Sequence, residues 1–153
     1  MSFDLDEVLL TQNAKDADRP LPVVFRYVMK SGLRKRAPAL IQELQHLGFD
    51  VWVYSSGFVA EDKLRKMFKF HGVQVDGIVN GLRNQQARET FRKAFTEQYE
   101  LSVHIDNEDV LAVNTRTKDY EETAVNADNN DWSAKSLAAV KANPIVTAML
   151  QRR

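Results

Sequence analysis

The sequence predicts an α/β fold with a largely parallel sheet, and two observations support this prediction. Apolar and turn residues alternate in blocks along the 153 residues, and successive blocks switch between the period of a strand and that of a helix. The strand-like block over residues 51–54 is apolar on both faces, as strands inside a parallel sheet are. Because neither a repeat nor a linker divides the chain, we expect residues 1–153 to form a single domain.

The first clear elements are a helix over residues 36–47 and a strand over residues 51–54. Apolar residues recur every three or four positions in the helix, and Gly48 stands where a helix C-cap belongs. The strand is a short β-rich run that leads into a polar loop, Ser55-Ser56-Gly57. We therefore expect this loop at the carboxyl end of a buried strand.

The remaining elements follow in the same alternation. The periods predict a helix over 61–70, a strand over 73–79, a helix over 84–98 and a strand over 101–105. The polar region 114–131 is expected to be loop with a short strand near 123–125. Residues 133–153 are expected to form C-terminal helices, the second of them opened by Asn143 and Pro144.

Composition excludes several classes of function. The chain has 21 Lys plus Arg and 21 Asp plus Glu, so its balanced charge argues against binding nucleic acid through bulk electrostatics. It has no cysteine, which excludes thiol catalysis, thiolate metal sites and disulfides. It also has no apolar run of the ~20 residues that a membrane span needs, and its acidic start lacks the basic and apolar regions of a signal peptide, so we expect neither feature. We expect a cytoplasmic protein, with neither a membrane nor nucleic acid indicated as a partner.

Polar residues that end successive strands are the candidate site. In open parallel sheets, ligands bind outside the carboxyl ends of the strands. Three such endings are present: Asp4 and Asp6, Ser55 and Ser56, and the acidic run that begins at Asp106. Carboxylate oxygens suit Mg²⁺, which tends to use one or two protein carboxylates together with phosphate and water.

These endings resemble the motifs of the haloacid dehalogenase superfamily of phosphohydrolases. The run from Phe3 to Leu9, which contains Asp4-Leu5-Asp6, is similar to the first motif. Ser55 after an apolar strand is similar to the second motif, and Ile105-Asp106 with the acids that follow resembles the fourth. The resemblance covers roughly residues 1 to 142.

The resemblance implies a Rossmann-like three-layer α/β/α sandwich and a Mg²⁺-dependent phosphatase that works through an aspartyl-phosphate. In that family pattern Asp4 is the nucleophile, and Asp6 is the general acid and base whose backbone carbonyl helps to hold the metal. Ser55 donates a hydrogen bond to the phosphoryl group and Asp106 completes the Mg²⁺ site. Ser56, Gly57 and a nearby cation are expected to bind the phosphorylated substrate, which is a small molecule or a macromolecule.

The cation of the family's third motif has several candidates here. Arg88 fits best, because it precedes Asp106 by about one helix and one strand, and it is placed among the catalytic and substrate-binding residues. Arg83, Arg92 and Lys93 remain alternatives. An arginine supplies the charge of the family's lysine and adds bidentate geometry.

The spacing between the motifs leaves no room for a sizeable cap domain. Residues 11–33 are expected to form a hairpin flap over the site, with a strand-like run over 23–27. A capless site is open, which implies access for bulky substrates or closure by a neighbouring subunit of a homo-oligomer.

Two other functions stay open beside the phosphatase. Glu7 and Asn107 depart from the family pattern and, with the uncertain third motif, favour a weak or inactive binding or regulatory module. A receiver-like signalling domain also uses acids at strand ends, but it has its acid pair and its phosphorylated aspartate on different strands. Two further sets of residues are interpreted as structural or solvated: the histidines His46, His71 and His104, and the basic run Lys30, Arg34, Lys35 and Arg36.

Overall fold

The computed structural model describes residues 1–26, 31–82, 84–106, 108–125 and 131–152. Its main sheet has six strands in the order β5-β4-β1-β6-β7-β8, and a second sheet pairs β2 with β3. The strands are β1 (Ser2–Asp4), β2 (Leu10–Thr11), β3 (Gly32–Leu33), β4 (Trp52–Tyr54), β5 (Gly77–Val79), β6 (Leu101–Ile105), β7 (Asp109–Asn114) and β8 (Tyr120–Ala124).

The parallel half of the main sheet is built from β5, β4, β1 and β6. Phe3 of β1 lies opposite Val53 of β4 on one side and Ile105 of β6 on the other. All three side chains are fully buried, as expected for strands that are covered on both faces. The expected strand over 51–54 and the expected strand over 101–105 are therefore confirmed, whereas the strand expected over 73–79 is limited to Gly77–Val79.

The other half of the sheet is antiparallel, whereas a largely parallel sheet was expected. β7 pairs with β6, and β8 pairs with β7. β7 lies just before the polar region 114–131, and β8 lies inside that region, where it begins earlier than the short strand expected near 123–125. The segment between β6 and β7 is too short for a crossover, and an immediate antiparallel return is the geometry it allows. The backbone N–H of Asp106 donates to the carbonyl of Asp109 at 3.0 Å and closes this return. The sheet is therefore mixed, with a parallel half and an antiparallel edge.

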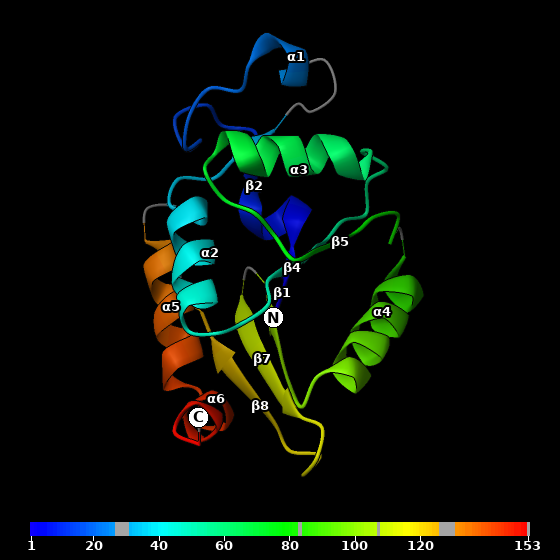
Figure 1. Ribbon diagram of the computed structural model, residues 1–153, viewed down its shortest axis with the longest axis vertical. Coiled ribbons are helices and arrows are strands. Elements are labelled where there is room, and N and C mark those ends of the chain that lie inside the picture. Colours follow the sequence, from blue (N-terminus) through cyan, green and yellow to red (C-terminus); the bar gives the residue numbers. More distant parts are fainter. Residues whose placement is uncertain (27–30, 83, 107, 126–130, 153) are drawn as a thin grey trace.

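Helices cover both faces of the main sheet (Figure 1). In that view α2, α5 and α6 lie on one side of the sheet and α4 on the other. The helices are α1 (Val23–Arg26), α2 (Ala37–His46), α3 (Glu61–Phe70), α4 (Gln85–Gln98), α5 (Trp132–Ala142) and α6 (Pro144–Leu150). The helices expected over 36–47, 61–70 and 84–98 are thus confirmed, and so are the two C-terminal helices. None of the helices in the described segments has the length and apolar composition that crossing a membrane requires.

Local sequence explains where these helices begin and end. Gly48 takes a φ of 86° directly after α2, a left-handed conformation that glycine adopts without strain. The side chain of Asn84 accepts a hydrogen bond from the N–H of Ala87 and caps α4. Asn143 accepts from Ile145 and Val146, and Pro144 opens α6.

The chain between β1 and α2 makes a tight turn and then a hairpin. Residues Leu5–Leu9 form a π-helical turn, η1, a rare conformation that often occurs at functional sites. β2 then pairs antiparallel with β3, at the two ends of the segment expected to form the flap. The strand expected over 23–27 is wrong, because Val23–Arg26 forms the short helix α1 after Pro22; Tyr27 lies outside the described residues. Proline suits the start of a helix because its missing N–H needs no partner there.

Candidate functional site

The carboxyl ends of β1, β4 and β6 meet at one edge of the sheet. β1 ends at Asp4, Ser55 follows β4 and Asp106 follows β6. Because β1 lies between β4 and β6 and is parallel to both, these three residues come together as the sequence analysis expected. The two aspartates lie on neighbouring strands.

Asp4 is enclosed at the centre of this edge. Its side chain is only 1% exposed, and its Oδ1 accepts a hydrogen bond from the backbone N–H of Asp6 at 2.9 Å. Its Oδ2 lies 3.6 Å from a guanidinium nitrogen of Arg88. The π-helical turn η1 brings the N–H of Asp6 back over the carboxylate. A backbone donor and a cation therefore both face the carboxylate of Asp4.

Asp6 has the opposite environment although it is only two residues away. It is exposed, and its Oδ2 accepts from the hydroxyl of Ser55 at 2.9 Å, from the N–H of Ser56 at 2.9 Å and from the hydroxyl of Ser56 at 3.0 Å. The hydroxyl of Ser55 also accepts from the N–H of Gly57. The loop expected to bind phosphate thus presents its donors to the carboxylate of Asp6.

Helix α4 supplies two arginines to the site. Arg88 faces Asp4, and its Nε also donates to the carbonyl of Leu82 at 3.3 Å. Arg92, one turn further along, lies 3.4 Å from Oδ2 of Asp106 and 3.0 Å from the hydroxyl of Tyr54. Residues four apart share one face of a helix, so one face of α4 provides a guanidinium to each of the two aspartates.

The other cation candidates take different places. Lys93 is exposed on α4, and Arg83 lies outside the described residues. Asn107 and the side chain of Glu7, the two positions that depart from the family pattern, also lie outside the described part of the chain. Of the candidates that the structure describes, Arg88 is the one that faces Asp4.

Acidic residues crowd the end of β6. Asp106 is partly buried, and Asp109 lies at the start of the antiparallel strand β7. Burial raises the pKa of Asp109, and the carboxylates of Glu122 and Asp106 raise it further, while Arg92 acts in the opposite direction. Arg92 therefore stabilises negative charge at this end of the sheet.

The donor set fits Mg²⁺ in its chemistry. Across the described segments, no three His, Asp or Glu side chains gather as a metal-binding group. Two carboxylates, those of Asp4 and Asp106, lie at the ends of neighbouring strands and pair with Arg88 and Arg92, while the side chain of Asp6 is turned toward Ser55 and Ser56. Mg²⁺ commonly takes one or two carboxylates and fills its remaining positions with carbonyl, phosphate and water oxygens. Asp6 would then contribute its backbone carbonyl, as the resemblance implies.

Sequence reasoning missed the contribution of Tyr54. Its side chain is 1% exposed, and its hydroxyl accepts the hydrogen bond that positions Arg92. Burial raises the pKa of Tyr54, an effect that the hydrogen bond from Arg92 opposes, so the hydroxyl is neutral at pH 7. The signal was present, because Tyr54 directly precedes Ser55 and Arg92 is four residues from Arg88.

The histidines and the tryptophans have surroundings typical of structural residues. His104 is buried between the hydroxyls of Ser2 and Ser102, and His71 is buried and bonded through Nδ1 to Asp18 at 2.9 Å. His46 is exposed. Of the basic run, Arg34 stacks on the ring of Trp132 at 4.8 Å, and Lys30 lies outside the described residues.

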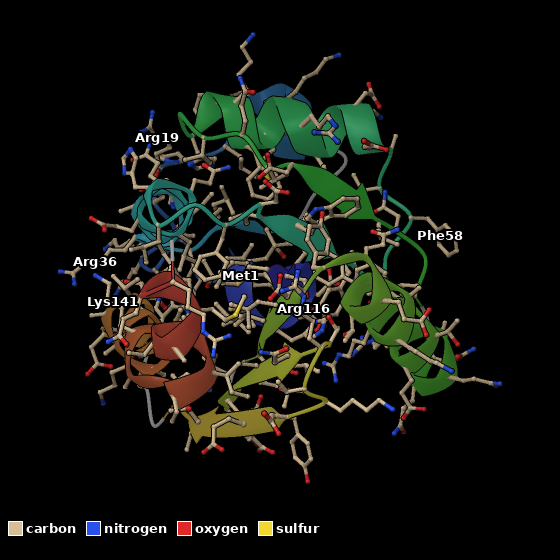
Figure 2. All side chains as sticks on the ribbon, turned by 60° about the horizontal axis from the view of Figure 1, so that its bottom comes forward. Met1, Arg19, Arg36, Phe58, Arg116 and Lys141 are labelled. Atoms are coloured by element: carbon tan, nitrogen blue, oxygen red, sulfur yellow. The ribbon has the colours of Figure 1, made fainter. Side chains whose placement is uncertain are left out.

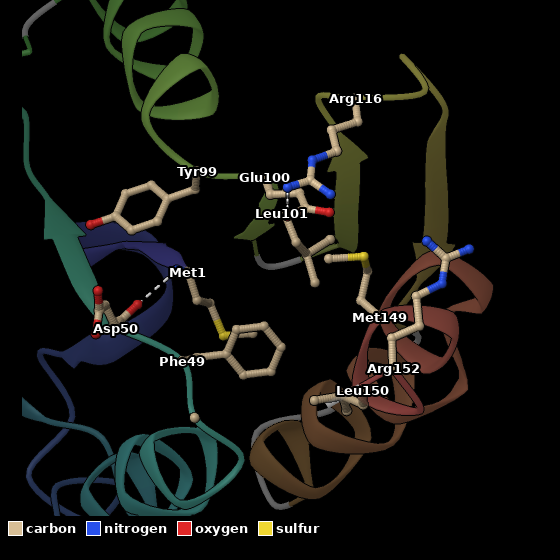
Figure 3. Close-up of a pocket in the computed structure, with 11 residues that line it drawn as sticks. Met1, Phe49, Asp50, Tyr99, Glu100, Leu101, Arg116, Met149, Leu150 and Arg152 are labelled. Carbon is tan, nitrogen blue, oxygen red and sulfur yellow. Dashed lines mark hydrogen bonds and ion pairs between the residues drawn. The ribbon is translucent and has the colours of Figure 1, made fainter.

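Two further surface features lie around the fold. A pocket of about 390 Å³ opens at the amino ends of β1, β4 and β6, the edge of the sheet opposite Asp4 (Figure 3). Its lining includes Phe49, Leu101 and Met149, and an ion pair of 3.0 Å joins Glu100 to Arg116 there. On the loop after β4, Phe58 projects from the surface and is 67% exposed (Figure 2). The pocket thus lies at the edge opposite the candidate site, whereas Phe58 follows Ser55 by three residues in the sequence.

Comparison of the chain with protein-family models, with curated proteins and with solved structures gives no match.

Proposed function

We propose that this protein is a Mg²⁺-dependent phosphatase of the haloacid dehalogenase type, which hydrolyses phosphoric monoesters through an aspartyl-phosphate. The observation that carries the proposal is the contrast between two carboxylates on one turn of chain. Asp4 is buried beside Arg88, and Asp6 is exposed beside Ser55. A nucleophile is held beside a cation that can face the transferring group, and a general acid and base exchanges protons with solvent, so each role matches one of these two environments.

Asp4 is suited to attack phosphorus. A carboxylate that approaches a phosphate faces repulsion between like charges, so cations must neutralise the transferring group. Arg88 lies 3.6 Å from Asp4 and can neutralise part of this charge.

Asp6 is suited to transfer protons. Its carboxylate is exposed and lies within 3.0 Å of three donors from Ser55 and Ser56. When Asp6 is protonated or turns away, these donors become available to the phosphoryl oxygens of a substrate. The neighbouring N–H of Gly57, now bonded to the hydroxyl of Ser55, belongs to the same loop.

The proposed reaction has two steps, transfer of the phosphoryl group to Asp4 and its release to water. In the first, an oxygen of Asp4 forms a bond to phosphorus, the ester P–O bond breaks, and a proton from Asp6 passes to the leaving oxygen. In the second, Asp6 takes a proton from water, the water oxygen bonds to phosphorus, and the bond between Asp4 and phosphorus breaks. The products are an alcohol and inorganic phosphate, with Asp4 and Asp6 restored.

Asp4, Asp106 and the backbone carbonyl of Asp6 are the groups that would hold Mg²⁺. When bound, the ion supplies positive charge against the phosphoryl oxygens. Arg88 supplies a second positive charge, on the side of α4.

The first test is hydrolysis of an aryl phosphate by purified Asp4→Asn protein. The substitution keeps the size and the burial of the side chain but removes its nucleophilic charge, so we expect kcat to fall by about 10³-fold or more. Asp62→Asn, in the exposed first turn of α3, is the matched control and should retain wild-type kcat. Activity of Asp4→Asn equal to that of wild type would contradict the mechanism.

A second candidate function is a non-catalytic binding or regulatory module. The observation that favours it is that Arg88 and Arg92 already pair with the two aspartates of the site. A well-folded sample that binds neither Mg²⁺ nor phosphate analogues would favour this candidate over the phosphatase.

A further inference from the structure

We propose that Arg92 is an internal counterion for Asp106 that competes with the divalent cation, so that this arginine sets the affinity of the site for the metal. The inference rests on the proposed function, because it takes Asp106 as a ligand of that cation. It concerns a residue to which the resemblance assigns no role in metal binding.

The geometry places Arg92 where a cation at Asp106 would meet it. One guanidinium nitrogen lies 3.4 Å from Oδ2 of Asp106. Both side chains are partly withdrawn from solvent, with 36% of Arg92 and 28% of Asp106 exposed. Water therefore screens the repulsion between the guanidinium and an approaching Mg²⁺ less than it would on an open surface.

Tyr54 holds the guanidinium in this position. The same Nη2 atom of Arg92 that faces Asp106 also donates to the hydroxyl of Tyr54 at 3.0 Å, and the guanidinium lies 5.8 Å from the centre of the tyrosine ring. Tyr54 is itself fixed, because it is buried at the end of β4 and its ring packs against Phe91 of α4 at 5.4 Å. Nη2 of Arg92 therefore makes two contacts, one with the hydroxyl of Tyr54 and one with Oδ2 of Asp106.

The contact with Asp106 can be exchanged. At 3.4 Å it is longer than an optimal charge-assisted hydrogen bond, and it is not bidentate. The Nε of Arg92 is buried and finds no hydrogen-bond partner within the described parts of the chain. An arginine held this way can retain Tyr54 and give up Asp106 when a cation takes the carboxylate.

Arg88 and Arg92 then have different tasks on one face of α4. Arg88 faces the proposed nucleophile Asp4 and is needed during phosphoryl transfer, whereas Arg92 faces a proposed metal ligand. Without the metal, Arg92 balances the charge of Asp106 and of the neighbouring Asp109, whose pKa it lowers against the larger effect of burial. A bound metal ion would neutralise the charge of Asp106 in place of Arg92.

The test measures Mn²⁺ affinity directly, by the electron paramagnetic resonance signal of the free ion, with competition by Mg²⁺. Arg92→Gln keeps most of the stem of the side chain and removes its charge, and we expect it to bind Mn²⁺ about tenfold more tightly than wild type. Lys93→Gln is the matched control, because it removes one positive charge from the next, exposed position of α4. It should bind Mn²⁺ with wild-type affinity.

A second measurement uses the wild-type protein and needs no variant to fold. In a Mg²⁺ titration followed by NMR, the Nε–Hε resonance of Arg92 should shift with the same dissociation constant as the metal. An unmoved resonance, or an Arg92→Gln variant whose Mn²⁺ affinity is unchanged or weaker, would overturn the inference. Equal tightening in Lys93→Gln would also overturn it, because net charge alone would then explain the effect.

Failure of the inference and failure of the proposed function give different results. If wild type hydrolyses an aryl phosphate with Mg²⁺ while Arg92→Gln shows no tighter metal binding, the phosphatase stands and the inference falls. If Arg92→Gln binds the metal more tightly while wild type hydrolyses no phosphoric monoester, the inference stands and the phosphatase falls.

Discussion

Neighbouring residues of this chain owe their different chemistry to what surrounds them. Asp4 and Asp6 are the same residue type two positions apart, yet one is buried beside a guanidinium and the other is exposed among hydroxyls. The turn η1 produces this difference by directing the two side chains to different partners. The pattern of the sequence indicated the pair of acids, but it did not show that Ser55 and Ser56 bond to the second of them.

His104 tests how burial changes the pKa of a single side chain in this fold. Its imidazole is buried in β6, and burial, together with the nearby charge of Arg92, lowers its pKa from 6.5 to about 3. The unfolded chain therefore takes up a proton at a higher pH than the folded chain. The stabilising effect of a neutral His104 is complete above about pH 6.5 and is lost as the pH falls from there toward 3.

We expect this titration to remove ~2 kcal/mol from the free energy of unfolding between pH 7 and pH 5. Urea unfolding at several pH values measures it. His104→Gln can keep hydrogen bonds to Ser2 and Ser102 and does not titrate, so its stability should fall by ~2 kcal/mol less over this range. Parallel pH profiles of the two proteins would show that His104 is not the group responsible.

At the scale of elements, close packing between β4 and β5 depends on one glycine. Gly77 lies opposite Trp52 in the parallel register, and a Cβ at this position would overlap the indole ring. That ring also packs edge-on against Phe95 of α4, with centroids 5.7 Å apart. The close approach at Gly77 therefore helps to place α4, and with it the two arginines of the site.

Gly77→Ala is expected to lower the free energy of unfolding by about 1–3 kcal/mol, because the indole must shift to admit the methyl group. Gly32→Ala is the matched control, since its Cβ would meet the nearest atom, Cβ of Ala17, at an ordinary 3.5 Å. The control should remain within about 1 kcal/mol of wild type in urea unfolding. Equal effects at both glycines would contradict the account of packing at Trp52.

The sequence predicted elements well where the apolar period was long and bounded by turn residues, as in α2 and α3. It failed where a short segment decided the pairing. The return from β6 to β7 depends on the few residues between Asp106 and Asp109, and periodicity does not distinguish a loop from a hairpin there. It failed again at Val23–Arg26, where β-branched residues favoured a strand but the chain forms a helical turn after Pro22.

The site was predictable to a similar degree. The sequence order of the acids placed Asp4, Ser55 and Asp106 at one edge of the sheet, because parallel strands bring their carboxyl ends together. The pairing of Arg88 with Asp4 was one of four alternatives. The contacts among Tyr54, Arg92 and Asp106 depend on how α4 is rotated on the sheet, which one sequence does not reveal.

On the scale of the whole molecule, the two edges of the sheet differ in character. The carboxyl edge gathers aspartates, serines and two arginines around Asp4, whereas the amino edge carries the partly apolar pocket of Figure 3. The net charge of zero conceals this local separation of acidic and basic groups. We place the proposed reaction at the carboxyl edge, because ligands of open α/β sheets bind outside the carboxyl ends of the strands.

The most direct test of the central claim is a crystal structure of the protein with Mg²⁺ and fluoroberyllate, which imitates a phosphoryl group bound to a carboxylate. We predict beryllium bonded to an oxygen of Asp4. The Mg²⁺ ion should lie between Asp4 and Asp106, and Ser55 and Arg88 should contact the fluorides. Fluoroberyllate bound to another residue, or a folded protein whose Asp4 stays unmodified at saturating fluoroberyllate, would contradict it.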